Sequence, residues 1–184
     1  MTGTRAVITA VALLLGLSAC SGEDPEPRVA PSSPSVPSTT AASVETTPEM
    51  PDAATAISQA GAERFIDFWF SVLTYSMVTG DTKPVQDVSS RGCKSCQALI
   101  DQIDDLYAKG GQVRTDGWQV AATTANGEFD VESPAFLLRV EQAGRTLLDG
   151  EKVVDRTPRA VVPMHIRLAN EAGSWMVSDL EIIE

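Results

Sequence analysis

Residues 62–80 read AERFIDFWFSVLTYSMVTG, and their apolar side chains recur with the period of an α-helix. Large apolar residues occupy two neighbouring faces of this helix, which leaves one narrow polar strip. The first face carries Ile57, Gly61, Phe65, Phe68, Trp69, Val72 and Ser76, the second carries Ile66, Phe70, Leu73 and Met77, and the strip carries Glu63, Arg64, Asp67, Ser71 and Thr74. A helix this apolar is buried on two sides, so we expect it between a sheet and another helix or in a homodimer interface. Gly80 is predicted to end it in the left-handed conformation.

Two further helices are predicted after Gly80. A short one covers residues 84–89, with Pro84 at its first position. A longer one covers residues 93–109 and ends at Gly110-Gly111. Its apolar stripe consists of Cys96, Leu99, Ile100, Ile103, Leu106 and Tyr107, and its opposite face carries Asp101, Asp104 and Asp105. We interpret those three carboxylates as a solvated helix face.

The hydrophobic period changes to two after Gly111, which is typical of β-strands. Strand-like alternation begins at Trp118, Phe136 and Val162, and a last strand covers residues 175–183. Turns are predicted at Asn126-Gly127, inside residues 144–157 at Asp149-Gly150, and at residues 170–173. Helices followed by antiparallel strands predict a single α+β domain over residues 55–184, with N-terminal helices packed on a mainly antiparallel sheet.

Residues 20–54 differ sharply in composition from this domain. They hold seven of the 11 prolines, together with many Ser, Thr, Ala and acidic residues, and show no apolar periodicity. Such a segment cannot bury enough apolar surface to offset the entropy of folding. We therefore predict a disordered, semi-extended stalk, which is either a plain spacer or a carrier of O-linked sugar on its Ser/Thr clusters.

Residues 1–19 have the features of an export signal. Arg5 supplies a positive start, and the following apolar run is too short to span a bilayer. The run ends in Leu17-Ser18-Ala19-Cys20, which resembles the lipobox of bacterial lipoproteins, where the cysteine receives diacylglycerol and acyl chains such as palmitate. The alternative is ordinary cleavage after Ala19, with Cys20 left as a free thiol. We expect lipid attachment at Cys20, and with it a location on the outer face of the bacterial plasma membrane.

The bulk composition limits the range of partners. The formal net charge is −11 and the hydrophobic content is 43%. A globular core is therefore expected, whereas binding to nucleic acid or anionic lipid headgroups is disfavoured by the negative charge.

Cys93-Lys94-Ser95-Cys96 is the motif that most resembles a reactive site. At a helix N-terminus a CxxC thiolate is stabilised, as in thioredoxin-like oxidoreductases, but those proteins place the motif after a parallel strand. Once Cys20 is assigned to lipid, Cys93 and Cys96 remain as a pair, and an exported protein favours a structural disulfide between them. Redox activity and metal binding by this pair are the alternatives.

No other residue pattern indicates catalysis. His165 falls on the polar side of a strand with no acidic neighbour predicted to orient it, and Asp67 falls on the solvated strip of its helix. A zinc site would have to combine Cys93 and Cys96 with this histidine. The chain has no G-x-S-x-G, phosphate-binding glycine loop or H-E-x-x-H. We therefore assign no catalytic, cofactor-binding or metal-binding residue.

The pattern Phe65-x-x-Phe68-Trp69-Phe70, Tyr75, Gly80-Asp81-Thr82, Cys93-x-x-Cys96, Tyr107, Gly110-Gly111 and Gly117-Trp118 resembles a family of uncharacterised actinobacterial lipoproteins. In that family a Pro/Ser/Thr stalk carries a domain of unknown function. The order of helices and strands is also similar to the nuclear-transport-factor-2-like superfamily, and this likeness implies a curved sheet in a cone-shaped domain. That superfamily includes enzymes and binding proteins, so the resemblance alone does not select an activity.

We favour a non-catalytic binding or scaffolding module at the cell envelope, with an envelope protein or a small ligand as partner. The alternative is a small-molecule enzyme of the isomerase or dehydratase kind that uses the pocket of a conical fold. Residues 144–157 form a long excursion with mixed charged and apolar residues. The excursion is either a small extra hairpin or a flap that frames a binding surface.

Overall fold

The computed structural model describes residues 46–183. The predicted signal segment, Cys20 and residues 21–45 of the predicted stalk lie outside the described residues. The folded domain includes a 3-10 helix at Asp52–Thr55, and Ala54 of this helix is fully buried in the core. The packed chain thus begins three residues before Thr55. Among the described residues, no helix has the length and hydropathy required to span a membrane.

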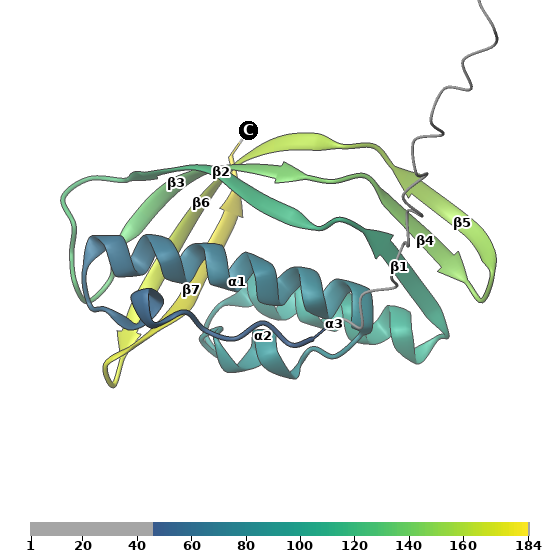
Figure 1. Ribbon diagram of the computed structural model, residues 1–184, viewed down its shortest axis with the longest axis horizontal. Coiled ribbons are helices and arrows are strands. Elements are labelled where there is room, and N and C mark those ends of the chain that lie inside the picture. Colours follow the sequence, from purple (N-terminus) through teal and green to yellow (C-terminus); the bar gives the residue numbers. More distant parts are fainter. Residues whose placement is uncertain (1–45, 184) are drawn as a thin grey trace, which may run out of the picture. The chain divides into compact units, whose positions relative to one another are not determined.

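Helix α1 (Gln59–Thr79) forms the centre of the domain, below the curved sheet in Figure 1. Ser58 caps its start, because the Ser58 Oγ accepts a hydrogen bond from the Gly61 N–H at 3.2 Å. Gly80 ends it with φ 79°, as predicted. Both predicted apolar faces are buried from Gly61 onward, but Ile57 is 38% exposed and precedes the helix. The prediction was therefore wrong for Ile57 alone on these faces.

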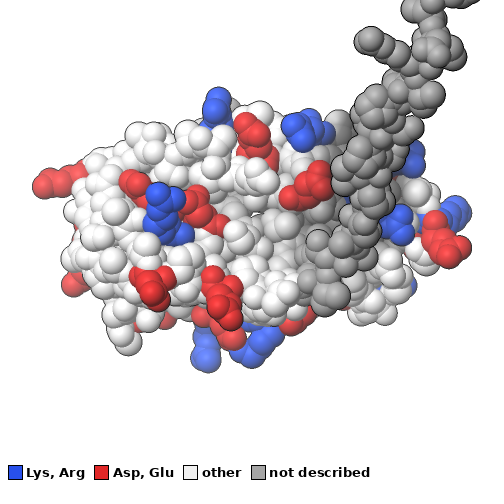
Figure 2. Space-filling view, in the orientation of Figure 1, with Lys and Arg blue, Asp and Glu red and all other residues white. Residues whose placement is uncertain are grey.

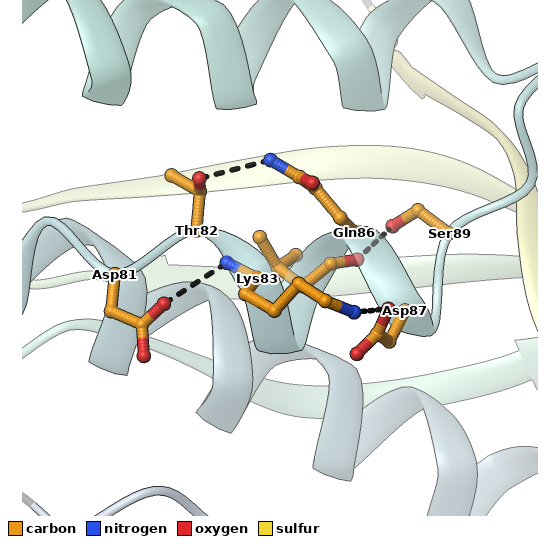
Figure 3. Close-up of polar contacts among 7 residues, drawn as sticks. Asp81, Thr82, Lys83, Gln86, Asp87 and Ser89 are labelled. Atoms are coloured by element: carbon orange, nitrogen blue, oxygen red, sulfur yellow. Dashed lines mark hydrogen bonds and ion pairs between the residues drawn. The ribbon is translucent and has the colours of Figure 1, made fainter.

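Helix α2 (Lys83–Asp87) joins α1 to α3 (Lys94–Ala108) through a short polar network, part of which Figure 3 shows. The indole N–H of Trp69 donates to Ser89 Oγ at 2.9 Å, and that hydroxyl donates to the Val85 carbonyl at 2.7 Å. On the other side, Thr82 Oγ1 donates to Asp104 Oδ1 at 2.8 Å. These bonds satisfy buried polar groups and fix the position of α3 relative to α1.

Helix α3 begins at a disulfide between Cys93 and Cys96, whose side chains are 0% and 1% exposed. Its apolar stripe divides into two parts, as the structure shows. Cys96, Ile100 and Ile103 are buried, whereas Leu99, Leu106 and Tyr107 are only half-buried. The carboxylates at positions 101, 104 and 105 are exposed, as expected.

The strands form two antiparallel sheets. The larger has the order β2 (Trp118–Ala125), β3 (Ala135–Gln142), β6 (Ala160–Glu171) and β7 (Ser174–Ile182). The smaller has the order β1 (Gly111–Thr115), β4 (Arg145–Asp149) and β5 (Lys152–Thr157). Alternate residues of β3, β6 and β7 pack on the helices, and Phe136, Ile166 and Val177 are fully buried.

Two strand predictions need correction. The connection after Asn126-Gly127 runs to residue 134, so it is a long loop and not a tight hairpin turn. The excursion at residues 144–157 does contain the β4–β5 hairpin around Gly150, but it pairs with β1, a strand that the sequence did not predict. The excursion therefore belongs to a sheet of its own. Helices packed on curved antiparallel sheets confirm the predicted α+β class.

Candidate functional site

A cavity of about 260 Å³ opens between α1, α3 and the smaller sheet. Its walls are mainly apolar. They consist of Leu73, Met77, Leu99, Gln102, Ile103, Leu106, Val113, Trp118, Arg145 and Leu147. Apolar concave surface with a few polar groups at its edge is the usual form of a small-molecule site.

A second cavity of about 200 Å³ adjoins the first along α3. The two share Leu99, Gln102 and Trp118. The second is lined by Ser95, Ala98, Leu99, Gln102, Trp118, Met164, Leu180 and Ile182. Together they follow α3 from residue 95 to residue 106, a length of roughly 16 Å at the helical rise per residue. We call this continuous surface the α3 groove.

The groove exists because the strands beside α3 cover one side of this helix only in part. Leu99 and Leu106 point toward the sheets but stay partly exposed, whereas Ile100 and Ile103 reach the core. Strands β1 and β4 supply the wall at one end through Val113 and Leu147. The smaller sheet therefore turns an exposed helix face into a lined cavity.

Trp118 forms the floor shared by both cavities, and its position is fixed locally. Its backbone N–H donates to Thr74 Oγ1 at 3.1 Å, and its ring lies 6.4 Å from that of Phe70. The preceding Gly117 has φ 87°, and a Cβ there would lie 2.2 Å from Thr74 Cγ2. Only glycine permits this close approach of β2 to α1.

Arg145 and Gln102 are the polar groups of the larger cavity. Arg145 is exposed at the start of β4, and its guanidinium donates to Thr157 Oγ1 at 3.4 Å. It takes part in none of the ion pairs found within residues 46–183. A cation without a carboxylate partner at the mouth of an apolar cavity is suited to an anionic group on a ligand.

The second cavity contains one hydroxyl, from Ser95. Its Oγ accepts a hydrogen bond from the Leu180 N–H at 3.3 Å and lies 3.6 Å from Cys93 Sγ. Neither cavity is lined by a histidine or a carboxylate among the described residues. A serine nucleophile needs such a base within hydrogen-bond reach, so this arrangement does not activate Ser95.

The residues singled out from the sequence do not converge on this groove. Cys93 and Cys96 form a buried disulfide. The group of possible metal ligands found in residues 46–183 consists of His165, Asp179 and Glu181 and includes neither cysteine. The prediction that His165 lacks acidic neighbours was therefore wrong. Its cause was an unrecognised bulge in the strand pairing of β6 with β7.

Asp67 lies on the solvated side of α1, as predicted. Partial burial raises the pKa of its carboxyl above 3.8, and the nearby Arg64 guanidinium at 3.5 Å opposes that shift. Because it faces away from the groove lining, it is not part of this site.

Three helices packed on curved antiparallel sheets define an α+β domain. The sequence profile of a family of unknown function, DUF6318, matches residues 37–180. This chain therefore belongs to the DUF6318 family. No curated protein matches it.

Solved structures with a similar fold include three of low sequence identity. The intermembrane space region of the chloroplast protein ARC6 superimposes with a TM-score of 0.51 at 13% identity, covering 74% of this chain and 98% of that one. A putative calcium/calmodulin dependent protein kinase II association domain from Xanthomonas campestris gives a TM-score of 0.43 at 12% identity, covering 68% and 86%. A protein of unknown function with a cystatin-like fold from Nostoc punctiforme gives 0.38 at 11% identity, covering 66% and 90%. At these identities the likeness concerns the fold alone.

Proposed function

We propose that this chain is a lipid-anchored envelope protein whose domain binds an amphipathic anion, an alkyl chain with an acidic head, without transforming it. The observation that supports the proposal is the α3 groove, two adjoining and mainly apolar cavities along roughly 16 Å of α3, with Arg145 in the lining of the larger one. The apolar walls fit the chain of the ligand, and the guanidinium fits its head.

The proposed attachment rests on the sequence of the N-terminal region. Lipid on Cys20, followed by a stalk to about residue 54, would hold the domain at the outer face of the membrane. Two acyl chains give durable anchoring, so Cys20→Ala is expected to release the protein into the medium and to abolish labelling by lipid precursors. Continued membrane retention of that variant would show that the attachment is wrong.

The size of the groove sets the expected affinity. A chain of about twelve carbons gains roughly 9 kcal/mol from burial of its methylene groups. Association costs at least about 4 kcal/mol, and an exposed charge pair with Arg145 contributes about 1 kcal/mol. Because this sum uses the smallest association cost, the tightest Kd expected is on the order of 10–100 μM.

Figure 2 shows acidic and basic side chains interspersed on the viewed face, and the net charge of −11 does not attract an anionic ligand over a distance. Selectivity in this proposal therefore depends on the groove itself.

The test compares ligands that share a chain but differ in their head group. Dodecanoate is expected to bind to the full-length protein about fivefold more tightly than dodecanol or dodecylammonium, measured by calorimetry below micelle-forming concentrations. Arg145→Ala should remove this preference and leave dodecanol binding unchanged. Arg156→Ala is the matched control, because Arg156 is on the same hairpin but alternates to the other face.

Two results would contradict the proposal. Equal affinities for the three head groups would remove the role of Arg145, and absence of binding by all three would remove the ligand class. Recovery of a chemically altered ligand would instead revive the isomerase- or dehydratase-like alternative.

A further inference from the structure

The outer face of the larger sheet, which points away from α1 and the groove, brings together three potential metal ligands. His165 of β6 lies opposite Glu181 of β7, and Asp179 precedes Glu181 by two residues on the same strand. Met164 and Ile166 are buried on the core side, so alternation directs His165 outward with the two carboxylates. The ligand atoms of the three side chains lie within 4.8 Å of one another.

Among the described residues, these three side chains have no other polar partner. Within residues 46–183, none of them makes a side-chain hydrogen bond or an ion pair. Arg167 lies directly opposite Asp179, yet the two are not in ion-pair contact in the described part of the chain. The imidazole and both carboxylates are therefore available to a ligand.

The geometry points to a binding site for a divalent transition metal, Zn²⁺ by preference, with His165, Asp179 and Glu181 as its protein ligands. Zinc accepts imidazole nitrogen and carboxylate oxygen at about 2.0–2.2 Å, and the imidazole disfavours Mg²⁺ and Ca²⁺, which take oxygen ligands. Two carboxylates balance the charge of the ion. Three protein ligands leave a coordination position open to solvent or to a fourth ligand.

The present separations are close to those that a bound ion requires. Ligand atoms around zinc lie roughly 3.5 Å apart in tetrahedral geometry, so the side chains must approach by about 1 Å. His165 and Asp179 are half-buried and Glu181 is exposed, so small side-chain rotations suffice without movement of the sheet. The backbone register of β6 and β7 already holds the three residues on one face.

Arg167 provides a charge test that distinguishes this site from a general acidic surface. Its guanidinium lies on the same face as the three metal ligands, and its positive charge repels the metal ion. Replacement by glutamine should therefore tighten metal binding severalfold. Glu141→Gln is the matched control, because Glu141 is an exposed carboxylate on the same sheet, opposite Val161 and distant in register from His165.

The experiment uses the fact that His165 is the single histidine of the chain. The full-length protein, purified without a polyhistidine tag, is titrated with Zn²⁺ and separately with Mg²⁺, and the imidazole resonances are followed by NMR. Zn²⁺ should shift them with 1:1 saturation, and Mg²⁺ should leave them in place. His165→Ala and Asp179→Asn should each weaken Zn²⁺ binding, measured by calorimetry, by at least about tenfold.

Unchanged imidazole resonances in excess Zn²⁺ would overturn the inference. Equal loss of affinity in Glu141→Gln and Asp179→Asn would also overturn it, because binding would then follow only the net charge. Thermal unfolding without metal checks that each variant is folded, and Glu181→Gln, a substitution of an exposed side chain, replaces any variant that is not. Because the site is on the face opposite the α3 groove, its failure would not affect the proposed ligand binding.

Discussion

Gly117 offers a direct test of how β2 is held against α1 at the floor of the groove. Its φ of 87° is unfavourable for any residue with a Cβ, which costs roughly 1–2 kcal/mol. An added Cβ would also lie 2.2 Å from Thr74 Cγ2 and 2.4 Å from Thr74 Oγ1, distances that force α1 and β2 apart. Overpacking of this kind costs about 1–3 kcal/mol more, so Gly117→Ala should lower the free energy of unfolding by roughly 2–5 kcal/mol.

Gly127 is a matched control for this substitution. Its φ is 92°, but an added Cβ would meet no atom within 4 Å. Gly127→Ala should therefore cost only the backbone part, roughly 1–2 kcal/mol. Urea unfolding of both variants, followed by circular dichroism, gives the difference, and equal losses in the two variants would refute the packing argument for Gly117.

Three further perturbations have defined outcomes. Ser89→Ala leaves the indole N–H of Trp69 buried without its partner and should lower the free energy of unfolding by about 1–3 kcal/mol in urea titrations; a loss below about 0.5 kcal/mol would remove this bond from the account. Replacing both Cys93 and Cys96 by serine should lower the free energy of unfolding by about 2 kcal/mol and leave ligand affinity unchanged. Rapid reduction of insulin by the unmodified protein in its reduced form would support the redox alternative. Asp67→Asn should stabilise the protein more at neutral pH than at pH 4. The folded-state pKa of the Asp67 carboxyl is raised, so the contribution of this carboxyl to stability falls as the pH rises through that pKa. The same pH dependence of thermal unfolding in the variant and the unmodified protein would contradict this.

Much of the fold could be predicted because its signals are local. The helical period of residues 62–80 and the glycine at position 80 each act within one element, and the structure confirms both. The short helix predicted at residues 84–89 is present, but it covers Lys83–Asp87, so Pro84 is its second residue and not its first. Strand β1 was missed because Gly111–Thr115 contains a single large apolar residue, Val113, and its partner β4 is distant in sequence. Pairing between distant strands is decided by tertiary contacts.

The sites were harder to predict than the fold. In the α3 stripe, Leu99 and Leu106 have the same periodicity as Ile100 and Ile103. The path of the smaller sheet decides which of these side chains line the groove and which are buried in the core, and the sequence does not show that path. The His165 cluster depends on a one-residue irregularity between Arg167 and Leu168. Glu171 pairs with Ser174 at the turn between β6 and β7. If that register continued along both strands without the bulge, a core residue of β7 would lie opposite His165, because a slip of one residue exchanges the two faces of a strand.

The most direct test of the proposed function uses the three tryptophans. Trp69 and Trp175 are 0% and 3% exposed, whereas Trp118 is half-buried and lines the α3 groove. An alkyl carboxylate brominated along its chain quenches a tryptophan only on close approach, so its binding should quench the fluorescence of the full-length protein through Trp118. We expect saturable quenching that is lost in Trp118→Phe and retained in Trp69→Phe. Equal quenching in both variants, or none in the unmodified protein, would contradict binding in the groove.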